Sequence, residues 1–295
     1  MREAIGSTRE GHLAMLAFSG LVAGSFSLGG QVAAEIAPTA LNAVRFGIAA
    51  VIMGAVVWAR GGVAREALHA PWRYLVLGGL FAVYFVLMFE GLKTAPPVSA
   101  AAVFTLTPLM SALFGWVVLR QVVGGRIAMA LLVGGVGAAW VIFRADLSAV
   151  LAFEIGRGEV IYFVGCIAHA LYTPMVRVLN RGESALVFSF LTLLACAGTI
   201  AIWGAGDMVA TDWGALRPMV WIAIAYTAVF ASALTVFLIQ FASLRLPSSK
   251  VMAYTYLTPS WVILWEIALG QPVPAVLVLG GVGLTVLALG MLLKD

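Results

Sequence analysis

Long apolar runs, each free or almost free of charged residues, constrain the fold of this chain more than any other feature of its sequence. A helix needs about 17 to 25 residues to cross the hydrocarbon region of a bilayer. With 63% hydrophobic and 10% charged residues, the 295 residues carry more apolar surface than one soluble core could bury. We therefore predict an all-α integral membrane protein with ten transmembrane helices, at 13–34, 39–59, 74–89, 98–119, 127–143, 160–176, 185–204, 219–241, 251–269 and 275–293.

The positions of Lys and Arg predict the orientation of these helices, because cytoplasmic loops retain such residues. If the N-terminus is inside, most of the 17 Lys and Arg fall in inner segments, and the outer loops hold only Lys93, Arg144, Arg157 and Arg217. One further cation, Arg45, falls within the second span. We predict an N-in, C-in, multi-pass protein of the inner (plasma) membrane.

The chain repeats itself after about half its length. Leu106-Thr107-Pro108 in the fourth span recurs as Leu257-Thr258-Pro259 in the ninth, and Gly-Gly-Val-Gly at 134–137 recurs at 280–283. Because each half holds an odd number of spans, the second copy must enter the membrane upside down relative to the first, which makes an inverted repeat. We expect a cytoplasmic tail at 1–12, a first five-helix repeat at 13–145, an external connecting loop at 146–159 and a second five-helix repeat at 160–293.

These features resemble a known superfamily. Pro38, Arg45-Phe46 and the Thr-Pro helices at Pro108 and Pro259, together with a Gly-rich span closing each half, resemble the drug/metabolite transporter superfamily in its ten-helix EamA-type branch. Within that branch the chain is similar to the YddG-type aromatic amino-acid exporters. The resemblance implies a secondary transporter that exports small metabolites, above all aromatic amino acids, by alternating access through a cavity between the repeats. It implies a small-molecule substrate, a lipid bilayer as surroundings and no cofactor.

The chain departs from the family pattern in one respect, at the ends of two spans. The family often has an acidic residue shortly after the fourth and ninth spans, and this chain has Arg120-Gln121 and Gln271 there. A gating role for such an acid is therefore not carried over.

Other functions would need residues that this sequence does not group together. A carrier of nucleotide sugars or phosphorylated solutes would need more buried Lys and Arg than Arg45. A membrane-embedded enzyme would need clustered Asp or Arg on a cytoplasmic loop to hold metal and phosphate. The cations are scattered, which speaks against a nucleic-acid surface. The oligomeric state is left open, and a monomer is compatible with the sequence.

Pro108 and Pro259 should lie near the middle of the membrane. A proline inside a helix removes one backbone hydrogen bond and favours a bend. We expect either a pair of static kinks or a pair of hinges, the latter freeing the carbonyls of Phe104 and Thr255 to line a cavity.

Polar side chains near the bilayer midplane are candidates for binding substrate, because facing lipid would be unfavourable for them. His169 is the only ionisable residue placed near the centre. It either forms a structural hydrogen bond with a neighbouring helix or acts as a donor to a substrate carboxylate or a proton-sensitive group. The candidate binding residues are His169, Tyr84, Ser27, Asn42, Thr105, Tyr254, Tyr256 and Ser232.

A charge cluster is expected nearer the outer end of the bundle. An arginine within a span is unfavourable by roughly 2.5 to 3.5 kcal/mol unless it is paired or hydrated. We therefore predict that Arg45 pairs with Glu90 or Glu35, or contacts the substrate.

Overall fold

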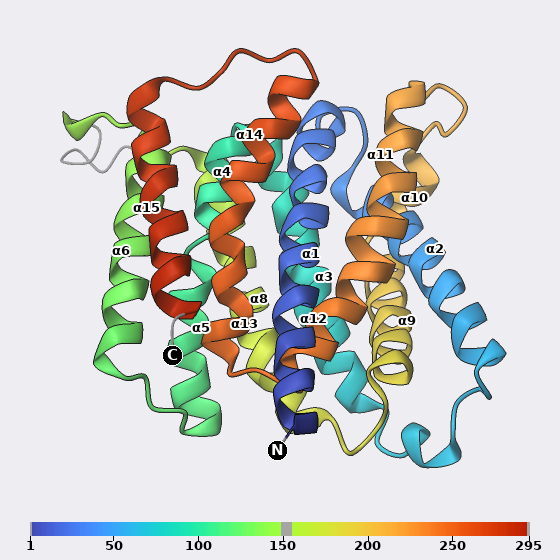
Figure 1. The fold of residues 1–295 in the computed structure, drawn as a ribbon. Helices are drawn as coiled ribbons and strands as arrows, with labels where there is room; N and C mark the ends of the chain where they lie inside the picture. The colour runs from blue at the N-terminus through green and yellow to red at the C-terminus, as the bar shows by residue number, and fades with distance from the viewer. Residues whose placement is uncertain (1, 149–154, 294–295) are drawn as a thin grey trace.

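The computed structural model describes residues 2–148 and 155–293, with side chains from residue 8 onward, and the elements in these ranges are helical (Figure 1). The first half contains α1 (Arg2–Val32), α2 (Pro38–Ala59), η1 (Arg65–Leu68), α3 (Trp72–Leu92), α4 (Pro97–Phe104), α5 (Thr107–Leu119) and α6 (Gly125–Ile142). The second half contains α8 (Arg157–Leu179), α9 (Ala185–Trp203), α10 (Ala205–Ala210), α11 (Pro218–Ala228), η2 (Val229–Leu234), α12 (Thr235–Ser243), α13 (Ser248–Ala253), η3 (Tyr254–Leu257), α14 (Thr258–Ala268) and α15 (Val276–Leu293).

Nine helical stretches in the described ranges are long and apolar enough to cross a membrane. The expected ninth span, 251–269, is not among them. It is helical, but it is divided into α13, η3 and α14, and tyrosines and threonines make its middle polar. The nine stretches are Thr8–Val32, Pro38–Ala59, Trp72–Leu92, Pro97–Leu119, Gly125–Ile142, Arg157–Leu179, Ala185–Trp203, Pro218–Ser243 and Val276–Leu293.

Two helices begin inside segments that the sequence assigned to the N-terminal tail and to the connecting loop. α1 starts at Arg2, so the expected tail at 1–12 is largely helical, as its Arg and Glu residues favour. α8 starts at Arg157, inside the expected connecting loop at 146–159, and Glu159 in its first turn suits the positive end of the helix dipole. Residues 149–154 of that loop lie outside the described residues.

Helices of the two halves pack against each other rather than forming two separate bundles. α3 packs on α8 and α9, α2 packs on α9, and α6 packs on α15. α1 packs on α11, α12 and α14, so the first helix is held mainly by the second half. Figure 1 shows α1 in front of α3, at the centre of the bundle. The buried core therefore lies between the halves.

The two Thr-Pro segments mark breaks in the helices, not bends within continuous ones. α4 ends at Phe104 and α5 begins at Thr107, so Pro108 lies in the first turn of a new helix. Pro259 has the same place in α14, after the 3-10 turn η3. In the first turn a missing N–H leaves no helical hydrogen bond unmade. The prediction of a free Phe104 carbonyl is wrong, because this oxygen accepts a 2.6 Å hydrogen bond from the Thr107 hydroxyl.

The two breaks meet at the centre of the bundle. α4 packs on α14 and α5 packs on α13, so the broken helices cross each other. At the crossing, the hydroxyl oxygens of Thr107 and Thr255 lie 3.3 Å apart. The breaks thus join the two halves through polar groups.

α6 and α15 approach each other through glycines. A Cβ atom added to Gly137 would lie 2.6 Å from the carbonyl oxygen of Gly281, and one added to Gly281 would lie 2.8 Å from that of Gly137. Such close backbone approach is typical of small residues between helices in lipid. Gly135 has open space around it, so the repeated glycines do not all serve the same contact.

Candidate functional site

The candidate site is built on the buried face of α8. Tyr162, Cys166, His169 and Tyr172 recur every three or four residues, which places them on one side of a helix, and all are buried. This side packs against α3, whose Phe81, Tyr84 and Phe85 are also buried. The spacing of the α8 residues could have revealed this face from the sequence, but the partners from α3 could not.

His169 is surrounded by aromatic rings. Its ring centroid lies 4.3 Å from that of Tyr84, 5.2 Å from that of Phe104 and 5.7 Å from that of Phe81. Its side chain is buried, and Nδ1 has no hydrogen-bond partner among the described residues. His169 Nδ1 therefore does not form the structural hydrogen bond that was one of the two expectations for this residue.

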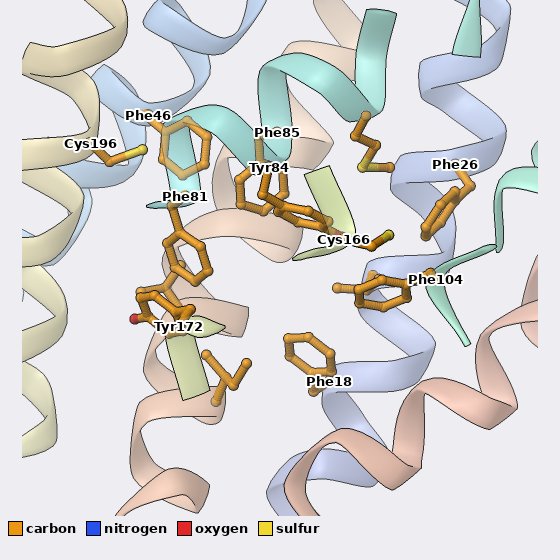
Figure 2. Packing of buried hydrophobic residues seen from close by; sticks show 14 of the residues in the cluster. Phe18, Phe26, Phe46, Phe81, Tyr84, Phe85, Phe104, Cys166, Tyr172 and Cys196 are labelled. Atoms are coloured by element: carbon orange, nitrogen blue, oxygen red, sulfur yellow. The ribbon is translucent and has the colours of Figure 1, made fainter. Parts of the chain in front are cut away.

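Further aromatic residues complete the wall around His169. The hydroxyl groups of Tyr84 and Tyr162 lie 3.0 Å apart, so the two tyrosines satisfy each other. Phe81 and Tyr172 stack with centroids 3.8 Å apart. Figure 2 shows Phe18, Phe81, Tyr84 and Phe104 gathered around one central region. Sequence analysis missed Phe18, Phe81 and Tyr162 as parts of this group.

A small cavity lies beside His169, and we call it the central chamber. Its volume is about 10 Å³, room for roughly one water molecule. The central chamber is therefore too small for an amino acid in this structure. The lining residues come from α1, α3, α8 and α12: Phe18, Val22, Phe81, Tyr84, Phe85, His169, Thr235, Val236 and Ile239.

Arg45 forms a second group next to the central chamber. Its side chain is 0% exposed. Nε donates to the Ser232 hydroxyl at 2.6 Å, Nη2 to the Ala231 carbonyl at 2.7 Å and Nη1 to the Asn42 side-chain oxygen at 3.4 Å. Ala231 and Ser232 belong to η2, a π-helical turn between α11 and α12. Asn42, Arg45 and Ser232, which the sequence proposed separately, thus lie together.

The expected charge cluster is not present. Glu90 pairs with Lys93 at 2.7 Å, and Glu35 pairs with Arg217. Arg45 contacts neutral groups instead. Arg217 lies in the loop between α10 and α11 of the second half and contacts Glu35 of the first half. The local sequence around either residue does not reveal this contact.

Ion pairs between the halves lie at both ends of the bundle. Arg217 donates to Glu35 beside α2 and α11, and Arg73 donates to Glu183 at 2.6 Å beside α3 and α9. In Figure 1 the loop before α11 lies at the upper end and the loop before α9 at the lower end. The sequence analysis missed both pairs.

The pKa values of the Glu35 and Glu183 carboxyl groups are both lowered, but by a different balance of causes. Hydrogen bonding from Arg217 lowers the pKa of Glu35 below its ordinary value. Burial acts to raise the pKa of Glu183, but the Arg73 hydrogen bond and backbone donors outweigh it, so this pKa is lowered too. Both carboxylates are therefore held in their charged form at neutral pH.

The Glu35–Arg217 ion pair borders a depression of about 510 Å³. Glu35, Asp207 and Arg217 line it, and the Thr39 hydroxyl donates to Asp207. This depression is separate from the central chamber, since the two share no lining residue. Within the described residues, no three His, Cys, Asp or Glu side chains come together as a metal site.

Four further candidates lie away from the central chamber. The Thr105 hydroxyl donates to its own helix at the Ala102 carbonyl, 2.6 Å away. The Tyr254 hydroxyl lies 3.1 Å from His12 Nδ1, and the Tyr256 hydroxyl lies 3.4 Å from the Leu131 carbonyl. Ser27 is buried, and its hydroxyl has no hydrogen-bond partner among the described residues.

Comparison with known proteins identifies a family. The model of the EamA-like transporter family matches residues 9–143 and again 156–293. The chain is 25% identical over 274 residues to a protein of Bacillus subtilis (strain 168) named "Uncharacterized transporter YyaM", covering 92% of this chain and 90% of that protein. A crystal structure with 22% sequence identity matches 97% of this chain and 96% of its own, with a TM-score of 0.72, which shows a shared fold.

Proposed function

This chain belongs to the EamA-like transporter family, and from that premise we propose that it exports amino acids, aromatic amino acids above all, by alternating access. The site would be the central chamber between the two halves. Ten membrane passes in two inverted repeats, with both termini inside the cell, complete the proposal.

The packing supports an inverted repeat. If α8 corresponds to α1, and α11 with α12 to α3, then contact of α3 with α8 has its counterpart in contact of α1 with α11 and α12. Likewise α4 packs on α14 as α13 packs on α5, and α6 packs on its own counterpart, α15. Two copies related by a two-fold axis in the membrane plane exchange partners in this way.

The small size of the central chamber, with an ion pair between the halves toward each end of the bundle, is the observation that carries the proposal. The chamber has room for about one water, and one ion pair between the halves lies toward each end of the bundle. Glu35 and Glu183 each precede the second long apolar stretch of their half, and Arg73 and Arg217 each lie at the start of the third. An alternating-access carrier needs two such closures that can open in turn.

The lining of the chamber supports an aromatic substrate. An aromatic substrate would occupy a slot opened between Phe81, Tyr84 and Phe104, whose ring centroids lie 5.7, 4.3 and 5.2 Å from that of His169. The same π faces attract an ammonium group. His169 Nδ1, unpartnered among the described residues, offers a polar contact.

Purified protein in liposomes tests the proposal. Labelled phenylalanine, tryptophan, threonine and a nucleotide sugar are supplied in turn, with and without a pH gradient. We expect counterflow of phenylalanine and tryptophan that exceeds that of the other two. Transport of the nucleotide sugar alone would reject the proposed substrate, and dependence on the gradient would identify proton coupling.

A further inference from the structure

Arg45 is a buried cation without a recorded anionic partner among the described residues. Its three hydrogen bonds go to a hydroxyl, a backbone carbonyl and an amide oxygen, all neutral. The ion pairs of the described residues involve Arg73, Lys93 and Arg217 instead. A buried charge is strongly unfavourable unless a counter-charge or many dipoles compensate it. The surroundings of Arg45 are therefore electrostatically incomplete.

The aromatic rings around Arg45 stabilise its positive charge but do not use its N–H donors. The guanidinium carbon lies 4.3 Å from the Phe85 ring centroid, 5.1 Å from that of Phe46 and 5.8 Å from that of Phe89. A guanidinium has five N–H donors in a planar fork that matches a carboxylate. The recorded bonds use one hydrogen on each nitrogen. Donors on Nη1 and Nη2 are thus left for another acceptor.

Arg45 also lies one side chain away from the central chamber. Phe85 stacks against the guanidinium and lines the chamber together with His169. Thr235 and Val236, which follow η2 directly, line it as well. A π-helical turn is a strained local winding that occurs often at functional sites. A shift of Phe85 or η2 would therefore open Arg45 to the chamber.

We propose that Arg45 receives the carboxylate of the transported solute, whose apolar or aromatic body fills the slot beside His169. This rests on the proposed function and adds a substrate class: solutes with a single carboxylate. One buried arginine balances one negative charge. A phosphorylated solute would bring a second charge into the same low-dielectric region without a partner.

A comparison of matched solutes tests this with the unmodified protein. Phenylalanine and phenethylamine differ only in the carboxylate. We expect the apparent affinity for phenylalanine to be at least about tenfold higher than that for phenethylamine, both in transport and in thermal stabilisation. The reason is that the amine would leave the hydrogen-bond donors of the site unpaired. Equal handling of the two by a working transporter would overturn the inference and leave the proposed function standing. Transport of neither would defeat the proposed function instead.

A variant that supplies an internal anion assigns the effect to Arg45. Asn42→Asp places a carboxylate where the Asn42 oxygen now accepts from Nη1, at the cost of the amide donations to Pro38 and Phe85. We expect it to reduce the preference for phenylalanine over phenethylamine by at least about tenfold. Asn42→Leu loses the same donations, and the acceptor for Nη1 with them, without adding charge, and should keep most of the preference. Loss of the preference in both variants, or in neither, would contradict a direct role for Arg45.

Arg45→Lys provides a further measurement. The lysine keeps the charge but lacks the planar fork, so we expect a raised KM for phenylalanine with a smaller change in maximal rate. Unchanged KM and selectivity in a folded Arg45→Lys protein would indicate a purely structural arginine and overturn the inference.

Discussion

Arg73 Nη2 lies 2.6 Å from Glu183 Oε1 and joins the start of α3 to the turn before α9. The side chains of Arg73 and Glu183 are 1% and 7% exposed, so water screens the pair only weakly. Arg73 also donates to the Leu179 carbonyl at 2.6 Å, and the Tyr74 hydroxyl lies 3.2 Å from Glu183. A buried network therefore holds the halves together at this end of their interface.

Removing one charge from this network should destabilise the closed protein. We expect Glu183→Gln to lower the free energy of unfolding by about 3 kcal/mol, because it leaves Arg73 buried without its anion. Thermal unfolding in detergent measures the change. In the double variant Arg73→Gln/Glu183→Gln the loss should be smaller than the sum of the single losses, and strict additivity would show that the two residues do not act as a pair.

The Glu35–Arg217 ion pair should respond to acid. The pKa of Glu35 lies below its ordinary value of 4.5 because Arg217 donates to it. A carboxylate with a lowered pKa stabilises the folded state above its unfolded pKa, and this stabilisation is lost as the pH falls through the lowered value. We expect the accessibility of residues near Arg217 to a water-soluble label to increase only below about pH 4.5. Glu35→Gln should remove this pH dependence, and a transition unchanged in that variant would assign it to another group.

Pro108 and Pro259 should matter for movement more than for stability. Both lie in the first turn of a helix, where alanine restores no missing helical hydrogen bond. If they act as hinges, Pro108→Ala and Pro259→Ala should each slow transport in liposomes while unfolding changes by only a few degrees. Unchanged rates would identify the prolines as static features of the fold.

His169 should affect transport without holding the fold together. Its Nδ1 forms no recorded hydrogen bond among the described residues, so little polar bonding is lost on substitution. We expect His169→Leu, which fills similar space, to reduce transport of phenylalanine at least about tenfold, because the polar contact to the substrate is lost. Preserved uptake combined with altered thermal stability would assign His169 a structural role.

The glycine contact between α6 and α15 should be intolerant of added volume. Gly137→Ala would bring a methyl group 2.6 Å from the Gly281 carbonyl oxygen, so the helices must separate. We expect a loss of about 1 to 3 kcal/mol in the free energy of unfolding. Gly135→Ala, which has open space around it, is the matched control and should change stability by about 0.5 kcal/mol or less. Similar losses in both variants would point to helix propensity or lipid contact instead.

The sequence by itself determined the local features of this protein. Uncharged apolar runs placed nine of the expected spans, because the thickness of a bilayer sets how many apolar residues a helix needs. The recurring Leu-Thr-Pro marked where the fourth and ninth spans depart from regular helix, although it predicted bends and the structure has breaks there. The burial of His169 also followed from its depth within a span.

Only the tertiary structure decided which of these residues meet. Arg45 was expected to pair with Glu35 or Glu90, and it bonds instead to Ser232, which is 187 positions away along the chain. The chamber beside His169 takes its walls from α1, α3, α8 and α12. Hydropathy and spacing describe each helix alone, whereas partners across an interface are chosen by how helices pack. The helices could therefore be predicted along the chain, whereas the residues that meet at the central chamber could be identified only from the packing of the two halves.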